Sequence, residues 1–324
     1  MSHPPVQLAT FPTPVEPAPR LAAAVGLGPE DLWVKRDDLT GVGGGGNKIR
    51  KLEWTVGAAL AEGADTLVTT GAPQSNHARL TAAAAARLGL AAVLVLRGSP
   101  GASRSGNLAL DGLLGARLLW AGEVDRAGLD AAAAEVCARL RKSGARPALI
   151  PFGGSSALGA RGYVRCADEL REQVPDLRTA VVALGSGGTM AGLVAGLGSE
   201  SVLGVDVGAL ADPAAAVEEF AAPHTTEKVT ADRLRVRRDQ VCSGYAKLTG
   251  PAAEALRLAA RTEGIVLDPV YTGRALAGLI AAVRDGDVRR GEKTVFVHTG
   301  GLPGLFGHAE AVAYAEEGSV VHDG

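Results

Sequence analysis

Short apolar runs rich in β-branched residues alternate with longer alanine- and leucine-rich stretches along most of the chain. A short apolar run bounded by turn residues predicts a buried strand, and a long alanine-rich stretch predicts a helix. The expected strands are residues 66–70, 91–96, 116–120, 147–150, 179–184, 202–207 and 294–297. The expected helices are residues 48–61, 76–88, 104–114, 126–142, 156–171, 187–197, 211–221 and 303–314.

This alternation of strands and helices predicts an α/β fold. Helices that connect parallel strands cover both faces of a sheet, and such crossovers are right-handed. A length of 324 residues suits two modest lobes or one large α/β unit. Residues 223–251 show charge but no regular period, so we expect an irregular segment on the surface near the ligand cleft.

Composition narrows the function classes. Aromatic residues make up only 4% of the chain, so the core must be built from Ala, Val and Leu. A net charge of −2 gives no electrostatic case for nucleic acid or an anionic membrane as a partner. No apolar run approaches the roughly 18 residues that span a bilayer, and the N-terminal residues do not resemble a signal peptide. We therefore expect a cytoplasmic protein.

The cysteines argue against a structural framework of disulfides or zinc. Cys137, Cys166 and Cys242 are odd in number and far apart in the sequence. We expect them to be small buried or half-buried side chains rather than catalytic groups.

The first candidate for chemistry is GGGGNKIRK, residues 43–51. A glycine run lets the backbone approach a ligand closely, and Lys48 and Lys51 follow it on one face of the expected helix. An asparagine separates the last glycine from Lys48, and Ile49 follows the lysine, so the segment departs from the phosphate-binding loop of ATPases. A solvated lysine on a flexible loop is the alternative, and the spacing alone does not decide between them.

The second and third candidates follow expected strands and open helices. In GAPQSNHAR, residues 71–79, Ser75 and Asn76 lie where helix amides favour anions, although ordinary helix capping explains them equally well. His77 is interpreted as a surface, packing or site residue. In GSGGTMAG, residues 185–192, the turn amides are expected to form a nest for phosphate. The nest residues are Ser186, Gly187, Gly188 and Thr189. The glycine spacing breaks the dinucleotide-binding pattern, which leaves NAD binding as the weaker alternative.

The fourth candidate combines LDPVYTG, residues 267–273, with HTGGLPGL, residues 298–305. Tyr271 and Tyr245 are two of only four tyrosines, and a phenol beside a cationic cofactor can move a proton. A core position with a satisfied hydroxyl is the alternative for Tyr271. Thr299 ends an expected strand, the usual place of a ligand contact.

Taken together, GGNKIRKLE, QSNHAR, GGSSALGA, GSGGTMAGL, LDPVYTG and HTGG resemble one family in order and spacing. This is the fold-type-II (tryptophan synthase β-like) pyridoxal-phosphate family of D-cysteine desulfhydrase and 1-aminocyclopropane-1-carboxylate deaminase. The resemblance runs from about residue 13 to residue 307. It implies a homodimer with a large domain, residues 1–54 and 159–324, and a small domain, residues 55–158. The cofactor is expected between the domains.

The resemblance also implies roles for individual residues. Lys48 is the Schiff-base lysine, and Lys51 supports the cofactor region. Asn76 bonds the ring hydroxyl, Thr299 meets the pyridine nitrogen, and residues 186–189 hold the phosphate. Ser75 receives the substrate carboxylate and, with Lys48 and Tyr271, is expected to be catalytic. The expected substrate-binding set is Ser75, Asn76, His77, Tyr245, Tyr271 and Thr272.

Position 272 favours one branch of the family. The cyclopropane deaminases typically carry glutamate at the position of Thr272 and glutamine at that of His77. At both positions this chain resembles the desulfhydrases instead. A neutral partner at the ring nitrogen suits elimination, in which a β leaving group drains the carbanion quickly. The expected reaction is therefore α,β-elimination on a small amino acid such as D-cysteine. The alternatives are cyclopropane-carboxylate deamination, an L-cysteate sulfo-lyase-like reaction and a non-catalytic pyridoxal-phosphate-binding protein.

One region departs from the family pattern. The segment around the second tyrosine reads Gly244-Tyr245-Ala246-Lys247 where the family has GYG followed by a proline-containing loop. The stretch before it, residues 208–240, is also shorter than in the family that the motifs resemble. Because both border the expected substrate pocket, the identity of the substrate stays open.

Overall fold

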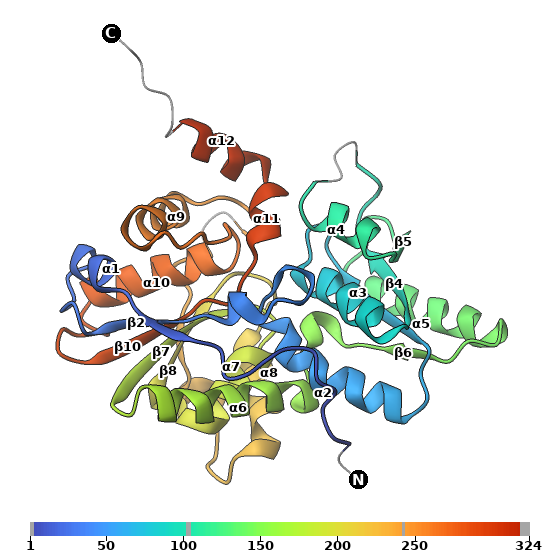
Figure 1. Cartoon of the computed structure of the whole chain (residues 1–324), viewed down its shortest axis with the longest axis horizontal. Helices are drawn as coiled ribbons and strands as arrows, with labels where there is room; N and C mark the ends of the chain where they lie inside the picture. The colour runs from blue at the N-terminus through green and yellow to red at the C-terminus, as the bar shows by residue number, and fades with distance from the viewer. Residues whose placement is uncertain (1–2, 102–104, 242–243, 318–324) are drawn as a thin grey trace.

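The computed structural model describes residues 3–101, 105–241 and 244–317. Two sheets form the centre of the molecule and lie side by side in Figure 1. The larger has the order β1-β2-β10-β7-β8-β9, and the smaller has the order β5-β4-β3-β6. The larger sheet contains β1 (Val15–Pro17), β2 (Leu32–Lys35), β7 (Leu177–Leu184), β8 (Val202–Asp206), β9 (Arg235–Arg237) and β10 (Lys293–Val297). The smaller contains β3 (Thr66–Gly71), β4 (Ala91–Leu96), β5 (Arg117–Trp120) and β6 (Pro147–Leu149).

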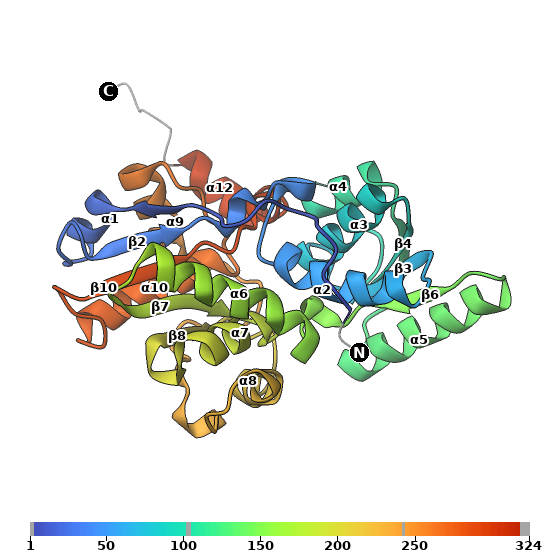
Figure 2. The same ribbon diagram turned by 60° about the horizontal axis from the view of Figure 1, so that its bottom comes forward.

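Helices cover both faces of each sheet, as the alternating pattern predicts. The larger sheet packs against α1 (Pro19–Ala24), α9 (Gly250–Glu263) and α10 (Thr272–Arg284) on one face. Its other face packs against α6 (Ala157–Gln173), α7 (Gly188–Leu197) and α8 (Pro213–Ala221). Figure 2 shows α3 (Asn76–Leu88) and α4 (Asn107–Leu113) on one side of the smaller sheet and α5 (Arg126–Lys142) on the other. α2 (Lys48–Ala61) leads from the larger sheet to the smaller, while α11 (Leu302–Phe306) and α12 (Ala309–Glu317) end the described chain.

Among the described strands every pair is parallel, as expected, with one exception. β1 pairs antiparallel with β2 at the edge of the larger sheet, and neither strand is among those expected from the sequence. The edge position explains the exception, because an edge strand needs only one partner and no crossover helix. The segment 223–251 is also less irregular than expected, since β9 pairs with β8 in parallel.

The predicted helix over residues 303–314 is two helices. α11 ends before Gly307, and α12 begins after His308, whose ring nitrogen accepts a hydrogen bond from the amide of Ala311. This side-chain acceptor starts the second helix separately. The expectation for the cysteines is confirmed for Cys137 and Cys166, which are buried, whereas Cys242 lies outside the described residues.

Helices α6 and α7 approach each other closely at two glycines. A Cβ on Gly192 would lie 2.3 Å from the carbonyl oxygen of Ala160, and one on Gly196 would lie 2.3 Å from the Cβ of Ala167. Any larger residue would therefore push the helices apart. The close contact brings the starts of both helices together, so that the amide of Gly188 on α7 reaches the hydroxyl of Ser155 just before α6.

The domain division stays a prediction. All four strands of the smaller sheet fall within residues 55–158, and all six of the larger sheet fall outside them. Within the described residues, no helix has the length and apolar character that crossing a bilayer requires.

Candidate active site

A cavity of about 190 Å³ lies between the two sheets, at the carboxyl ends of β3, β7 and β10. This is the edge where ligands bind in open parallel sheets. Most of the predicted site residues line it, namely Lys48, Ser75, Asn76, His77, Ser186, Gly187, Thr189, Tyr245, Tyr271 and Thr299. The cavity therefore brings together all four segments that the sequence singled out.

Lys48 is the first residue of α2 and points its amine into the cavity. Its Nζ donates a hydrogen bond to Oδ1 of Asn47 over 3.0 Å and lies 5.6 Å from the centre of the Tyr271 ring. Burial lowers the pKa of Lys48 to about 8; the nearby Asp268 opposes this effect and Arg79 adds to it. A lysine with this pKa carries an appreciable neutral fraction near physiological pH, which is what a nucleophilic amine needs.

The glycine run before Lys48 is shaped by a buried arginine. All four glycines at positions 43–46 have positive φ, a conformation that favours glycine. Arg79 of α3 donates hydrogen bonds to the carbonyl oxygens of Gly43 and Gly45, and its side chain is fully buried. The run therefore connects the two sheets and fixes where α2 starts.

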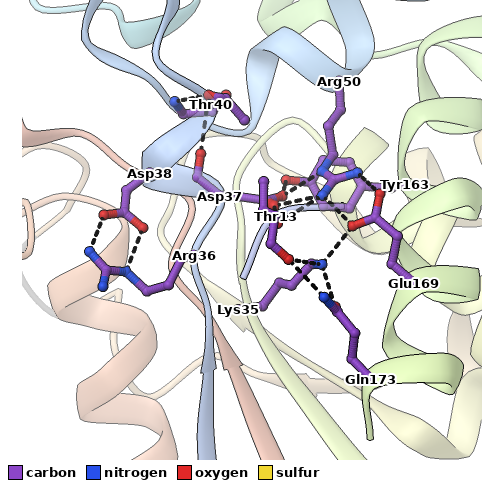
Figure 3. A network of polar contacts seen from close by, with 11 residues as sticks. Thr13, Lys35, Arg36, Asp37, Asp38, Thr40, Arg50, Tyr163, Glu169 and Gln173 are labelled. Carbon is purple, nitrogen blue, oxygen red and sulfur yellow. Dashed lines mark hydrogen bonds and ion pairs between the residues drawn. The ribbon is translucent and has the colours of Figure 1, made fainter. Parts of the chain in front are cut away.

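A second anchor holds α2 from the side of the larger sheet. Figure 3 shows the guanidinium of Arg50 bonded to both oxygens of Asp37 and to the carboxylate of Glu169 on α6. Tyr163 donates to Asp37, and Lys35 donates to Glu169. Burial alone raises the pKa of Asp37, but the charge and hydrogen bonds of Arg50 outweigh it, so the pKa lies below its usual value. The ion network thus keeps the start of the lysine-bearing helix in place.

Four polar groups, one of them the amine of Lys51, meet around the hydroxyl of Ser155. The hydroxyl oxygen of Ser155 accepts from Nζ of Lys51 at 3.0 Å and from the amide of Gly188 at 3.2 Å. It also shares a hydrogen bond of 2.7 Å with the hydroxyl of Ser186. Burial and the neighbouring Lys48 hold the pKa of Lys51 well below its usual value. These donors meet at one point where two helices begin, which is a favourable place for an anion.

The residues at the start of α3 present polar groups to the cavity. Ser75 caps the helix, accepting from the amide of Ala78 at 3.1 Å, so its own hydroxyl proton remains available to a ligand. Oδ1 of Asn76 accepts from Nδ2 of Asn107 at 3.0 Å, which leaves the Asn76 amino group as a donor. Capping and ligand binding are therefore compatible here, although the sequence made them alternatives.

His77 is neutral in this environment. Its Nε2 lies 2.9 Å from the hydroxyl of Thr69, which itself donates to the carbonyl oxygen of Ile150. The imidazole must then carry its proton on Nε2, and Nδ1 is buried without a hydrogen-bond partner. Burial, together with the charges of Lys48 and Lys51, lowers the pKa of His77 well below its ordinary value.

Two tyrosines face each other across the cavity. Their hydroxyl oxygens lie 2.5 Å apart, and the rings of Tyr245 and Tyr271 meet edge to face at 6.2 Å between centroids. Burial and the neighbouring Tyr245 raise the pKa of Tyr271 well above its usual value, so its hydroxyl keeps its proton. Asp268 fixes Tyr271 at the start of α10, since its carboxylate accepts from the amides of Tyr271 and Thr272.

Thr272 lies apart from the cavity. The side chain is fully buried, and its hydroxyl donates to the carboxylate of Asp268 at 2.7 Å. The structure therefore places Thr272 beneath Tyr271 rather than against a substrate, because the threonine is needed to satisfy the start of α10. Lys51 and Gly188 reach the site only through Ser155.

Three residues of the site carry no prediction from the sequence. Asn47 joins the lysine segment to the phosphate-nest segment through a 2.9 Å hydrogen bond to Thr189. Asn107 orients Asn76, and Ser155 gathers the donors beside Lys51. Ser155 belongs to GGSSALGA, and its place between a strand and a helix was the available signal.

A family model described as pyridoxal-phosphate dependent enzyme matches residues 6–300. The match covers most of the chain and includes every cavity-lining segment. The chain belongs to this family. The cofactor is therefore pyridoxal phosphate, and the protein is a lyase of the type that includes deaminases and desulfhydrases.

This pyridoxal-phosphate enzyme is similar to relatives that carry two different enzyme names. A Pyrococcus horikoshii protein, provisionally named 1-aminocyclopropane-1-carboxylate deaminase, is 41% identical over 95% of this chain and 94% of its own. A D-cysteine desulfhydrase of Salmonella schwarzengrund is 40% identical over 94% and 96% of the two chains. Among solved structures, an ACC deaminase homologue has a TM-score of 0.86 at 39% identity, covering 96% of both chains. A fungal L-serine ammonia-lyase from Rhizomucor miehei shares the fold, with a TM-score of 0.68 at 19% identity, covering 96% of this chain and 99% of its own.

The described residues fit the chemical groups of pyridoxal phosphate. The donors of Lys51, Ser155, Ser186 and Gly188 suit a phosphate, because no carboxylate is bonded to any of them. The amine of Lys48 suits the aldehyde, and the free donor of Asn76 suits the ring hydroxyl. A phosphate dianion would also stabilise the protonated form of Lys51, whose pKa is otherwise lowered.

Proposed function

We propose that the protein catalyses α,β-elimination on a small β-substituted amino acid, with D-cysteine as the preferred type of substrate. The products from D-cysteine would be sulfide, pyruvate and ammonia. When bound, the cofactor supplies an aldehyde that takes up the substrate amine and a ring that accepts electrons from its α-carbon.

The residues of this chain then have separate tasks. Lys48 holds the cofactor at rest and, once the substrate amine replaces it, its Nζ takes the α-proton. A pKa near 8 suits this task, because the amine loses its proton readily near neutral pH. Ser75 and the amides at the start of α3 bind the substrate carboxylate. Tyr271 orients the substrate with a hydroxyl that stays protonated and is held by its hydrogen bond with Tyr245.

One observation supports elimination over cyclopropane opening. Thr272 is neutral and bonded to Asp268, and the only acidic side chain among the described cavity-lining residues is Asp125 on the opposite lobe. Thr299 is then the proposed partner of the ring nitrogen. A neutral partner withdraws fewer electrons than an acid would, which suits a reaction whose leaving group departs quickly.

A panel of D- and L-amino acids tests the proposal. The purified yellow protein should release pyruvate and sulfide from D-cysteine faster than 2-oxobutyrate from 1-aminocyclopropane-1-carboxylate or sulfite from L-cysteate. Faster release of 2-oxobutyrate would reject elimination in favour of the deaminase activity that the Pyrococcus relative's name carries.

The role of Lys48 has its own test. Reduction with borohydride followed by mass spectrometry should place the cofactor on Lys48, and Lys48→Ala should be colourless and inactive. An adduct on a different residue would reject the assignment. An adduct on Lys48 without turnover of any β-substituted amino acid would instead indicate a protein that binds the cofactor without catalysis.

A further inference from the structure

Tyr245 lies on a short loop with unusual backbone geometry. Gly244 and Ala246 on either side of it have φ of 115° and 61°. Ala246 is the only non-glycine residue with positive φ in residues 3–101, 105–241 and 244–317. A residue with a Cβ adopts this conformation only where its surroundings hold it there. Tyr245 remains 37% exposed, so burial of its own side chain does not supply that constraint.

The constraint comes from a fully buried arginine on α10. One terminal nitrogen of Arg274, Nη2, donates to the carbonyl oxygens of both Gly244 and Lys247, at 2.6 and 2.8 Å, and the side chain is fully buried. The other, Nη1, donates to the carbonyl oxygens of Val207 at 2.9 Å and Val241 at 3.4 Å. The guanidinium thus binds the loop on both sides of Tyr245 and connects it to the end of β8.

Arg274 also lies one turn after Tyr271 on the same helix. Asp268 fixes Tyr271 at the helix start, so the distance between the phenol of Tyr271 and the guanidinium is set by one rigid turn. The loop that Arg274 holds then brings the Tyr245 hydroxyl to 2.5 Å from that of Tyr271. His308 adds a weaker, more exposed support, donating from Nε2 to the carbonyl oxygen of Ala246 at 2.9 Å.

We propose that Arg274 is a positioning residue that holds Tyr245 against Tyr271 over the cavity. It does so by fixing the backbone of residues 244–247, not by touching the substrate. This rests on the proposed function only in that the tyrosine pair serves the reaction. A lysine cannot substitute fully, because one ammonium bonded to the carbonyl oxygens of the loop cannot also reach those of Val207 and Val241, which the second guanidinium nitrogen binds.

The experiment combines Arg274→Gln and Tyr245→Phe in a double-mutant cycle on the cofactor-loaded full chain. If Arg274 acts through Tyr245, each single variant should lower kcat/KM at least 10-fold for the best substrate of the panel. The double variant should then be within about 3-fold of Tyr245→Phe alone, because neighbours that act together are not additive. Independent, multiplying losses would overturn the proposal.

A second readout does not depend on turnover. Hydrogen exchange of the cofactor-free protein should be at least 10-fold faster at residues 244–247 in Arg274→Gln, with α10 unchanged. Arg284→Gln is the matched control, since Arg284 is an exposed arginine of the same helix that pairs with Asp285. Unchanged exchange in the loop would overturn the proposal. This outcome does not depend on whether the reaction proposed above is correct.

Arg274→Lys covers the case in which Arg274→Gln fails to fold. It keeps the charge and most of the volume, so it should retain cofactor and show intermediate loop exchange and an intermediate loss of kcat/KM. Wild-type exchange in a folded Arg274→Lys protein would show that charge alone suffices and would overturn the positioning role of the guanidinium.

Discussion

Replacing Lys48 by methionine should stabilise the cofactor-free protein, although it removes the proposed reactive group. Burial lowers the pKa of Lys48 from 10.5 to about 8, which means that the folded protein holds the ammonium form unfavourably. Each pKa unit corresponds to about 1.4 kcal/mol, so the cost at pH 7 is at most about 3–4 kcal/mol. The side chain is only half-buried, and methionine also loses the hydrogen bond to Asn47. A gain of about 1–2 kcal/mol therefore remains after solvent screening.

The pH dependence gives this prediction its signature. The folded pKa lies below the unfolded one, so between pH 8 and 10.5 the unfolded chain binds more protons and the stability of the wild-type protein rises with pH. Lys48→Met lacks this contribution. Its advantage should be largest at pH 7 and below, and should shrink as the pH rises towards 10.

Urea denaturation of the cofactor-free proteins at pH 7, 8.5 and 10 measures the effect. Lys142→Met is the control, because Lys142 is an exposed lysine at the end of α5 and should show no such trend. A Lys48→Met protein that is no more stable than wild type at pH 7, or whose advantage does not change with pH, would refute the electrostatic argument.

Three further predictions concern groups around the site. Asp37→Asn should lower the free energy of unfolding by about 3 kcal/mol in urea, because it breaks a buried ion pair and leaves Arg50 with only the carboxylate of Glu169 as its counter-charge; a loss below 1 kcal/mol would contradict this. Lys51→Met should weaken cofactor binding about 10- to 100-fold in an absorbance titration, because the positive charge beside the phosphate and the charged hydrogen bond that holds Ser155 are lost; unchanged affinity would contradict the phosphate assignment. Ala246→Gly should raise the free energy of unfolding by about 1 kcal/mol, because glycine adopts φ of 61° without strain; destabilisation would show that the loop is not strained.

Local sequence signals predicted several elements to the residue. The helices at 48–61, 76–88 and 126–142 begin and end as expected, because their limits are encoded locally. Ser75 and Asp125 cap two of them, and Gly89 ends one in the left-handed conformation. The glycine and polar motifs likewise identified most of the cavity wall, since strand ends in a parallel sheet meet at one edge.

The remaining features depend on contacts between distant parts of the chain. Ser155 meets Lys51 across 104 residues, and Asn107 meets Asn76 across 31. No local pattern marks Asn107, and the motif GGSSALGA marks the place of Ser155 without naming its partner. Thr272 is the opposite case. Its position in a motif predicted a ligand contact, whereas its hydroxyl bonds Asp268 at the start of α10 and is buried there.

The two glycines of α7 that contact α6, Gly192 and Gly196, have a consequence for the evolution and engineering of this enzyme. Gly192 and Gly196 do not line the cavity, yet their lack of side chains sets the spacing at which α6 and α7 lie. That spacing decides whether Ser155 and Gly188 can share one point in space. The affinity for pyridoxal phosphate therefore depends partly on a helix interface one to two turns away from Gly188. An added methyl group at Gly192 or Gly196 would change how much cofactor the protein binds without touching the cofactor.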